Sequence, residues 1–487
     1  MTDFTGKRVF VHGRTGKSPF ESPRTNTTPH GGVSKTHPNK HPRTHVQQSS
    51  IREDNMESNK PGCLEGRPFP SGRVVVTEDA PALAALSAAV PGTSGRAALV
   101  TDANVARHHL ERFRSALASV GLEAVVSILP PGEATKSPET VVGLLSTWAA
   151  AGLTRSDAVV AFGGGVVGDA AGLAAALYMR GVTFINCPTS LLAAVDASVG
   201  GKTGVNLAQG KNLMGVFRDP LAVLIDPSLL RTLPVSEWTN GMAEVVKLAF
   251  VAPKMDAEAL CADLLTGPFI DGARPEAPLF EAAFDEVRAA RLVSRAVGLK
   301  TAIVEQDPFE RPGTGRRRLL NFGHTLGHVL ERLSGYTLAH GRAVSAGMEL
   351  VTRGAVRLGL VAPDALERLL ALMAVHGLPR AAEVLGELHG KLDGDAPGVI
   401  AAAAFTDKKR TGFGIPVVLP TSEKGPARVV TMGPAPFARF VSAALAEGDP
   451  FPVSSFSQAF HPDSERNRPW RVGCDAAEAG NVRSEEA

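Results

Sequence analysis

The chain of 487 residues contains only four cysteines, and they are scattered without a CxxC pair or a disulfide-type spacing. This usage is typical of proteins from a reducing compartment. No apolar run reaches the length of a membrane span, and the first residues lack the compact apolar core of a signal peptide. We therefore expect a cytoplasmic protein that does not bind membranes.

Neither sign of charge dominates the sequence, since 51 Lys and Arg stand against 49 Asp and Glu, for a net charge of +2. This balance gives no reason to expect nucleic acid as a partner. Internal repeats are also absent. A chain of this length can form two or three domains with sizeable cores, so the function has to be sought in local patterns.

The two ends of the chain contain few large apolar residues. Residues 1–68 are rich in Ser, Thr, Pro, His, Lys and Arg, and residues 448–487 are polar and rich in Pro. We expect a disordered extension and a disordered tail, because such compositions cannot bury enough apolar surface. The basic first segment also has the composition of an organelle transit peptide, although it shows no amphipathic helix.

Between these ends, the first ordered region alternates strands with helices. The expected strands cover residues 73–77, 97–101, 124–129, 158–162 and 183–187, and the expected helices cover 80–89, 105–120, 138–151 and 170–179. This alternation predicts an α/β domain over 69–234 with an open, mainly parallel sheet. Ligands of such sheets bind beyond the carboxyl ends of the strands, where Asp102, Glu133 and Lys136 are expected.

A glycine-rich turn follows the strand at 158–162. Gly163, Gly165 and Gly168 have the dinucleotide-binding spacing, in which bare backbone approaches a pyrophosphate at a helix N-terminus. The usual acidic residue at the end of the next strand is missing, since that strand ends in Cys-Pro-Thr-Ser at 187–190. We therefore expect a nucleotide that is held differently from the cofactor of an ordinary Rossmann dehydrogenase.

A second polar stretch follows among further glycines. Asp196, Lys202, Asn206, Lys211 and Asn212 would suit an anionic ligand rich in hydroxyl groups. A solvated surface loop is the alternative interpretation.

Residues 235–447 read as a mostly helical domain, with one short strand pair near 412–419. Glu244 and Lys247 lie three residues apart and share a helix face. His324 and His328 lie four apart, and His340 begins another expected helix. Two histidines and one carboxylate form a catalytic zinc set.

Spacing alone would pair His324 with His328, as metalloproteases do. Thr325, however, stands where a protease needs its general-base glutamate, so a protease is disfavoured. Further cations in this domain fit a substrate that carries carboxylate or phosphate, or they are solvated helix charges. These cations are Lys300, Arg317, Lys408 and Lys409.

Together these stretches resemble the 3-dehydroquinate synthases of the sugar phosphate cyclase family, over roughly residues 99–419. The most specific motifs are PGEATKSPET, GGGVVGDAAG, YMRGV, PTSLLAAVDASVGGKTGVN, GKNLMGVF, GMAEVVK, RRRLLNFGHTLGHVLE, AHGRAVSAGM and TDKKRTG. The resemblance implies an N-terminal NAD-binding α/β domain, an all-α C-terminal domain and an active site in the cleft between them. It also implies conversion of 3-deoxy-D-arabino-heptulosonate 7-phosphate to 3-dehydroquinate and phosphate in the shikimate pathway of aromatic amino acid biosynthesis.

The resemblance assigns roles to individual residues. It implies a zinc site, with cobalt as the alternative metal, formed by Glu244, His324 and His340. It places NAD on Asp102, Asn104, Glu133, Lys136, Gly164, Gly165, Val166, Val167, Gly168, Asp169, Thr189, Ser190, Lys202, Lys211, Thr232 and Glu237. It places the sugar phosphate among Asp196, Lys202, Asn212, Lys247, Lys300, Arg317, Asn321, His328 and one of the pair Lys408 and Lys409, of which we favour Lys409. Arg180 matches an arginine that reaches the phosphate site of a neighbouring subunit, which implies a homodimer.

The sequence also departs from the family pattern. Ser190 replaces a second threonine, Leu248 replaces an aromatic residue, and the loop 305–316 is longer than usual. Arg342 replaces a glutamate and puts a cation two residues from a metal ligand, which is the departure that raises the most doubt.

Three other functions remain open. Cyclases of secondary metabolism act on sedoheptulose 7-phosphate or an amino analogue, but they lose part of the carboxylate-binding set, which is complete here. A polyol dehydrogenase would not need so many anion-binding groups. A catalytically inactive relative would lack a metal ligand or a lysine, and none is missing.

Overall fold

The computed structural model of the chain describes residues 73–76, 84, 95–271, 274–281, 283–310, 316–392, 394–406 and 414–446. The expected disordered segments 1–68 and 448–487 lie outside these residues, and so does almost all of the helix expected at 80–89. Within the described ranges, no helix is both long enough and apolar enough to cross a membrane.

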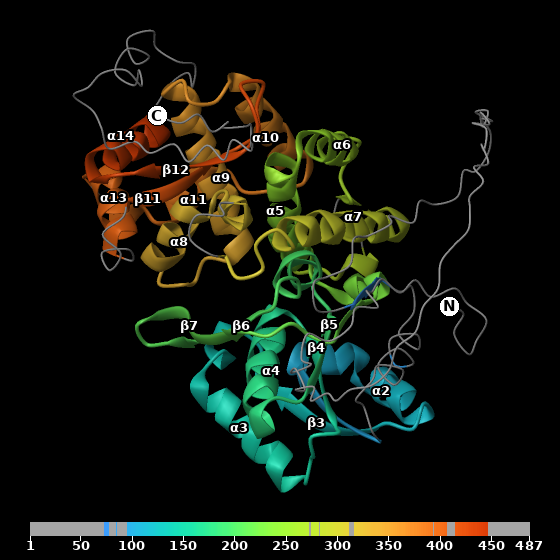
Figure 1. Ribbon diagram of the computed structural model, residues 1–487. Helices are drawn as coiled ribbons and strands as arrows, with labels where there is room; N and C mark the ends of the chain where they lie inside the picture. The colour runs from blue at the N-terminus through green and yellow to red at the C-terminus, as the bar shows by residue number, and fades with distance from the viewer. Residues whose placement is uncertain are drawn as a thin grey trace, which may run out of the picture. The chain divides into compact units, whose positions relative to one another are not determined.

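The first region is built on a parallel sheet of six strands (Figure 1). Their spatial order is β1 (Arg73–Val76), β8 (Ala222–Ile225), β5 (Thr183–Pro188), β4 (Ala158–Gly163), β2 (Arg96–Asp102) and β3 (Glu123–Leu129). Every neighbouring pair runs parallel. The central strands are buried apolar runs, as parallel strands covered on both faces should be. The predicted sheet is confirmed, and β8 is a strand that the sequence pattern missed.

Helices cover both faces of this sheet. Their bounds are α2 (Ala103–Ser119), α3 (Pro138–Ala150) and α4 (Gly165–Leu177). Because side chains alternate along a strand, neighbouring residues of β2 belong to opposite layers. Ala98 and Val100 pack with α3 and α4, whereas Ala97 and Leu99 pack with α2. Because all six strands run parallel, their carboxyl ends lie along one edge of the sheet. The glycine-rich turn follows β4 at this edge.

Two details differ from the sequence-based expectation. The helix after the glycine turn begins at Gly165, five residues before the expected start at 170. The polar stretch after 200 is not a loop but an antiparallel hairpin of β6 (Lys202–Leu207) and β7 (Gly210–Phe217). Glycines conceal this hairpin in the sequence, yet the pairing needs them: a Cβ at Gly204 would lie 3.0 Å from the carbonyl oxygen of Met214.

The second region is mostly helical. After the short helix η4 (Pro227–Thr232) it contains α5 (Val235–Val251), α6 (Lys254–Leu264), α7 (Glu286–Val304), η6 (Arg317–Asn321), α8 (His324–Leu333), α9 (His340–Arg357), α10 (Pro363–Val375), α11 (Ala381–Glu387), α12 (His389–Leu392), α13 (Ala396–Thr406) and α14 (Pro434–Leu445). Two small antiparallel pairs join them, β9 (Ile270–Asp271) with β10 (Ala283–Phe284) and β11 (Ile415–Leu419) with β12 (Arg428–Met432). The region is therefore helical with two short strand pairs, not strictly all-α.

Helix α9 is the centre of this region, because α5, α8, α10, α11 and α14 all pack against it. Small residues allow the close approach. The backbone of Gly347 packs directly on Gly323 and Gly327 at the start of α8. The main hydrophobic core also includes Leu191 and Val195, which precede the expected domain boundary at 234/235. That boundary stays a prediction, since packing is continuous across it.

Candidate metal and substrate site

Three helices bring two histidines and a glutamate together. Glu244 lies on α5, and His324 and His340 are the first residues of α8 and α9. The Nε2 atoms of His324 and His340 lie 3.7 and 3.4 Å from Oε1 of Glu244. One ligand atom from each residue falls within 4.8 Å of the others. The three residues that the resemblance assigns to zinc are therefore neighbours.

Hydrogen bonds on the far side of each ring fix the direction of both histidines. Nδ1 of His324 lies 3.1 Å from the carbonyl oxygen of Phe322, and Nδ1 of His340 lies 3.1 Å from Oε1 of Glu331. Both partners are acceptors, so each Nδ1 can donate a proton to its partner, which turns Nε2 toward Glu244. Second partners of this kind are usual for histidines that bind metals.

Glu331 was not identified from the sequence, although a signal was present. It lies three residues after His328 and seven after His324, so all three share one face of α8. The structure places Glu331 within reach of a second ligand set with His328 and His340.

Close packing of α5 on α9 aligns the ligands. Oδ1 of Asn240 accepts a hydrogen bond of 2.5 Å from the backbone N–H of Gly341. A side chain at Gly341 would run into the backbone of Asn240, so glycine is needed there. Since Glu244 follows Asn240 by one helical turn and His340 precedes Gly341, this contact brings the carboxylate to the imidazole.

The charge distribution fits a divalent cation. Both carboxylate oxygens of Glu244 are buried, with Oε2 paired to Lys247 and Oε1 facing the two histidines. Burial opposes ionisation of Glu244, but the nearby charge of Lys247 and then the histidines hold its pKa well below the usual range. Burial lowers the pKa of His324 to about 3, which leaves a neutral imidazole as a metal ligand requires.

The surroundings of His340 also favour a positive charge. Burial alone would lower its pKa, but Glu244 and Glu331 flank the ring and raise the pKa to about 10. A cation is therefore stabilised at this point, and a metal ion would supply the same charge. Two imidazole nitrogens and a buried carboxylate are a donor set that zinc or cobalt fits.

A chain of buried and half-buried charges extends from the predicted metal ligands. Asp196 belongs to η3 (Ala193–Ala197), a single π-helical turn of the kind that often marks functional sites. Its Oδ1 lies 2.5 Å from Nζ of Lys300 on α7 and 3.7 Å from Nζ of Lys247 on α5. Lys247 also forms an ion pair with Glu244. The sheet region and the helical region thus contribute to one cluster.

The two lysines differ in how firmly they hold a proton. Burial lowers the pKa of Lys300 to about 8, although Asp196 acts in the opposite direction. Burial also opposes the charge of Lys247, but Glu244 and Asp196 together raise its pKa. Lys247 is therefore a permanent cation, whereas Lys300 can exchange a proton near neutral pH.

Further predicted substrate residues gather beside this cluster. The guanidinium of Arg317 donates a hydrogen bond of 2.8 Å to the carbonyl oxygen of Gly200. Asn321 donates one of 3.1 Å to Oε1 of Glu310, and Lys202 forms an ion pair with the same carboxylate. Glu310 was missed in the sequence because it lies in the lengthened loop 305–316. The ring of His328 lies 5.2 Å from that of His324.

The glycine-rich turn presents bare backbone at the start of α4. The N-cap residue Gly164 provides no side-chain acceptor, so the first N–H groups of the helix are available to an anion. Lys136 pairs with Asp169 at 2.5 Å, and Asn206 donates to Glu133 at 2.8 Å. Uncapped N–H groups beside these polar side chains fit the pyrophosphate of NAD.

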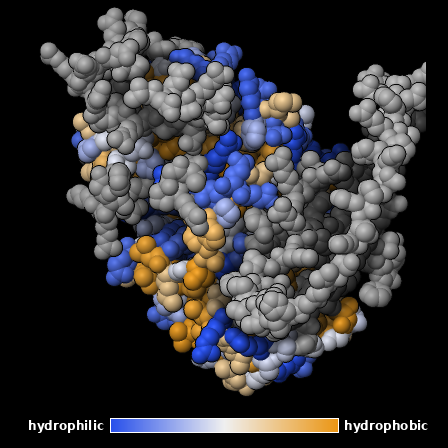
Figure 2. Space-filling model, in the orientation of Figure 1, coloured by the Kyte–Doolittle hydropathy of each residue, from blue (hydrophilic) through white to orange (hydrophobic). Residues whose placement is uncertain are grey.

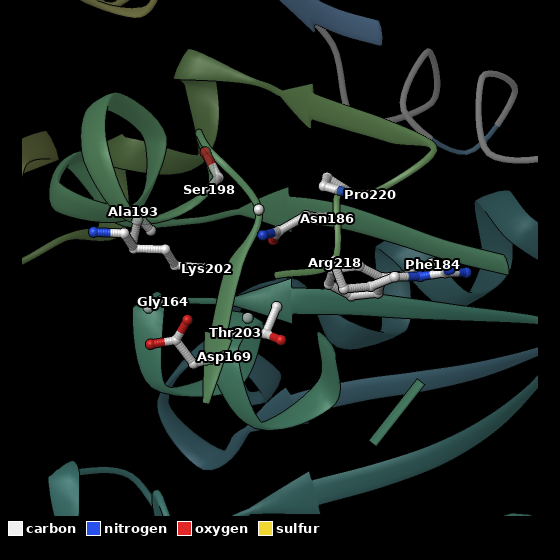
Figure 3. A pocket seen from close by; sticks show the side chains of 14 residues that line it. Gly164, Asp169, Phe184, Asn186, Ala193, Ser198, Lys202, Thr203, Arg218 and Pro220 are labelled. Carbon is white, nitrogen blue, oxygen red and sulfur yellow. The ribbon is translucent and has the colours of Figure 1, made fainter. Parts of the chain in front are cut away.

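A cavity of about 10 Å³ lies under this turn, large enough for one water molecule. Figure 3 shows Asp169 and Lys202 on the same side of it, with Asn186 pointing inward from β5. Asn186 is buried and was not singled out in the sequence. Burial raises the pKa of Asp169 in spite of the adjacent Lys136.

Other residues predicted to bind NAD have local partners. Asp102 caps α2 by accepting from the N–H of Asn104 at 2.8 Å, and Thr232 lies 2.7 Å from Nε2 of His109. Oγ of Ser190 accepts from the N–H of Ala193 at 3.3 Å. The backbone N–H of Thr189 donates to Gly163 at the glycine turn. Their cofactor roles stay predictions.

Two of the predicted cofactor residues lie close to the metal ligands. Glu237 accepts from Asn240 at 3.1 Å, and Lys211 lies 3.7 Å from Glu331 and stacks over Tyr336. The backbone of Asn212 has a left-handed φ of 56° and donates to Asn206. The hairpin β6–β7 thus lies between the glycine turn and the metal site.

Arg342 points away from the predicted metal ligands. Its guanidinium points to Glu383 and Glu387 on α11, where it forms ion pairs. Arg180 is remote from the cluster, at the other end of α4 from the glycine turn. Lys408 and Lys409 lie outside the described residues, so the role of Lys409 stays a prediction.

Comparison with solved structures defines the class of protein. A 2-epi-5-epi-valiolone synthase from Streptomyces hygroscopicus, solved with NAD+ and Zn2+, matches 79% of this chain and 98% of its own, with a TM-score of 0.63 and 29% identity. A 2-deoxy-scyllo-inosose synthase, solved with carbaglucose-6-phosphate, NAD+ and Co2+, shares the fold at a TM-score of 0.60 and 21% identity. The fold is that of the sugar phosphate cyclases.

Sequence comparison is more specific. The 3-dehydroquinate synthase N-terminal model matches residues 126–240, and the C-terminal model matches residues 241–410. The 3-dehydroquinate synthase of Mesorhizobium japonicum is 42% identical over 316 residues, which are 62% of this chain and 76% of the relative. That of a Synechococcus strain is 39% identical over 325 residues, 66% of this chain and 82% of the relative. The chain belongs to the 3-dehydroquinate synthase family.

Proposed function

We propose that the chain converts 3-deoxy-D-arabino-heptulosonate 7-phosphate to 3-dehydroquinate and phosphate, as a phosphate-eliminating lyase of the shikimate pathway. The observation that carries this proposal is the continuous cluster from Glu244 through Lys247 and Asp196 to Lys300. It joins a metal-binding trio to groups that recognise anions. The dehydroquinate synthases to which the chain is about 40% identical support the same activity.

Two cofactors fit the residues present. Glu244, His324 and His340 would hold zinc, with cobalt as the alternative, and the turn at Gly164 and Gly165 would hold NAD. When bound, NAD removes a hydride from a secondary alcohol and later returns it, while the metal polarises the alcohol oxygen.

The cluster itself orients the substrate. Asp196 accepts a hydrogen bond from Lys300 and forms a longer ion pair with Lys247, so it holds both ammonium groups beside the substrate. The planar fork of Arg317 and the amide of Asn321 suit the substrate carboxylate. His328 is exposed beside the metal ligands, where it can exchange a proton with the substrate.

Lys202 and Asn212 lie on the hairpin, where they can face the phosphate that leaves. Positive charge at that point stabilises the departing dianion. We assign the remaining cation to Arg180 of a second copy, so that the active form is a homodimer. Exposed apolar side chains on α3, at the end of α4 and on the hairpin support this assembly, and they include Val142, Leu177, Met179, Leu207 and Leu213. Figure 2 shows hydrophobic residues over the hairpin and the α3–α4 helices.

The test is phosphate release by the purified chain given 3-deoxy-D-arabino-heptulosonate 7-phosphate, NAD and zinc, with and without a chelator. The expected result is stoichiometric formation of phosphate and dehydroquinate that stops after chelation and resumes when zinc is restored. No turnover of this substrate by protein that has bound NAD and zinc would refute the proposal.

A second candidate is a cyclase that acts on sedoheptulose 7-phosphate, and the fold match to the valiolone synthase favours it. That substrate lacks the carboxylate for which Lys300, Arg317 and Asn321 are suited. We expect it to release phosphate far more slowly than the heptulosonate in the same assay. The reverse preference would assign the chain to this second class.

A further inference from the structure

The turn that carries Arg180 has an unusual backbone. Met179 has φ 48° and ψ 30°, Arg180 has φ 67°, and Gly181 has φ 111°. Two successive residues with side chains therefore occupy the left-handed region, which only glycine adopts without strain. Such strain persists only where the surroundings enforce it, and it is concentrated at functional positions.

Arg155 supplies one of the enforcing contacts. Its Nε and one terminal nitrogen donate to the carbonyl oxygen of Met179 at 3.1 and 2.9 Å. The loop that carries Arg155 is itself rigid, because the carboxylate of Asp157 accepts from both the N–H and the hydroxyl of Thr154. The guanidinium of Arg155 is therefore held in place while it donates to the carbonyl oxygen of the strained residue Met179.

The next residues are held from the other side. Arg218, which follows the hairpin strand β7, donates to the carbonyl oxygen of Val182 at 2.9 Å. The hydroxyl of Tyr178 donates to the carbonyl oxygen of Leu153 at 2.8 Å. The turn is thus fixed at both ends, while the side chain of Arg180 is exposed and has no hydrogen bond or ion pair with any described residue.

Arg180 cannot serve the site of its own chain. The glycine turn lies at the start of α4 and Arg180 lies just beyond its end, so 13 helical residues, or about 20 Å, separate them. Arg180 also precedes β5, so it lies at the amino edge of the sheet, opposite the edge where ligands bind. A rigid, unpaired arginine in that place suits an anion on a second copy.

Resting on the proposed function, we propose that Arg155 is a positioning residue for the phosphate step. It locks the left-handed turn 179–181 so that Arg180 projects into the phosphate site of the second copy. Arg155 then acts on the partner's reaction and not on its own. A residue that only stabilises the fold would instead affect the reaction in its own chain.

The test uses complementation between two inactive variants, coexpressed with different tags and purified as the mixed dimer. Phosphate release should fall on the order of 10-fold or more in both Arg180→Ala and Arg155→Ala, because a charged hydrogen bond to phosphate is lost or misplaced. Either variant should regain activity in a mixed dimer with Lys247→Ala. The Lys247→Ala chain has an inactive site of its own, but it still supplies an intact Arg180 to the site of its partner. Lys202→Ala acts within its own site and should not be rescued by the same partner.

Two further measurements separate positioning from stability. The double variant Arg155→Ala/Arg180→Ala should be no worse than Arg180→Ala alone, because both changes remove one interaction. Inhibition by inorganic phosphate should weaken equally in the two single variants. Arg428→Ala is the matched control, since Arg428 likewise donates to a backbone carbonyl, that of Leu360, without touching the turn or the loop that carries Arg155. It should leave phosphate inhibition unchanged.

The outcomes separate the two proposals. No phosphate release by the unsubstituted chain refutes the proposed function, and the positioning role with it. An active chain in which Arg155→Ala keeps full activity refutes only the positioning role. The positioning role is also refuted if pairing with Lys247→Ala restores the activity of Arg180→Ala but not that of Arg155→Ala. It is refuted as well if the activity losses of the two single variants multiply in the double variant.

Discussion

The helical region and the sheet region prepare their parts of the site in opposite ways. In the helical region Glu244 and Lys247 are buried, and they pair with each other and with the half-buried His324 and His340. In the sheet region the turn at Gly164 offers uncapped backbone N–H groups and almost no side chain. The first arrangement selects a ligand by charge and fixed geometry, the second by shape and by the approach of bare backbone. Changes in the first should therefore alter stability and binding together, whereas a small side chain at Gly164 in the second should alter binding alone.

The largest effect is expected from Glu244→Gln. The substitution keeps the volume but removes the charge that holds the metal, and it leaves Lys247 buried with only Asp196 at 3.7 Å. Zinc should be lost during dialysis, and phosphate release should fall by roughly 10³-fold or more, since metal stabilisation contributes several kcal/mol. Metal analysis and the phosphate assay measure the two effects.

The control for this change is Glu383→Gln, on an exposed ion pair with Arg342, which lies two residues from His340. It removes a carboxylate from the same region without touching the three ligands, so zinc and activity should be retained. Full zinc content in Glu244→Gln would show that the trio is not the metal site.

A second buried carboxylate in the helical region behaves differently from Glu244. Glu349 on α9 accepts from Arg353, from Arg380 twice and from the N–H of Ala381, which ties α9 to α11. Although burial opposes ionisation, these donors, led by Arg380, lower its pKa from 4.5 to about 2. Such a group stabilises the fold fully above pH 4.5 and loses that contribution as pH falls toward 2.

Glu349→Gln should accordingly lower the free energy of unfolding at pH 7 by about 3 kcal/mol at most. The difference from the unsubstituted chain should shrink between pH 4.5 and 2, as followed by denaturant unfolding in metal-free protein. An unchanged difference across that range would mean that the loss comes from packing and not from ionisation.

Sequence patterns predicted the parallel sheet and the helical region, because long periodic runs of apolar residues correspond directly to the buried faces of strands and helices. They missed the hairpin β6–β7, because the glycines that let its strands approach also imitate a loop. They placed the start of α4 too late for the same reason. Motifs identified Glu244, His324 and His340, but the choice between His328 and His340 depends on how α9 packs on α5, which spacing along one helix does not encode.

Partners from other elements were harder to find. Glu331 carries a helical-spacing signal, whereas Glu310 lies in a loop whose path no periodicity describes. Arg155 and Met179 are 24 residues apart, so their contact exists only after the turn between α4 and β5 has formed.

The smallest effect is expected from Gly164→Ala in the sheet region. The backbone there has φ −74° and ψ −172°, which alanine adopts freely, and the new Cβ would lie 3.5 Å from Oγ of Ser190, an ordinary contact. Replacing glycine by alanine at an N-cap costs about 1 kcal/mol or less, so the fold should be nearly unchanged. The methyl group would nevertheless occupy the approach to the N–H groups of α4, so the Kd for NAD should rise about 10-fold, as lost contacts with a charged group imply.

Gly163→Ala is the contrasting variant, because a Cβ there would lie 2.6 Å from Cγ2 of Val167 inside the same turn. It should lower the Tm, whereas Gly164→Ala should weaken NAD binding at an almost constant Tm. Calorimetry with NAD and thermal unfolding distinguish the two. If Gly164→Ala binds NAD as tightly as the unsubstituted chain, the pyrophosphate does not lie on this turn. The contrast between a charge-selected and a backbone-selected half of the site would then have to be abandoned.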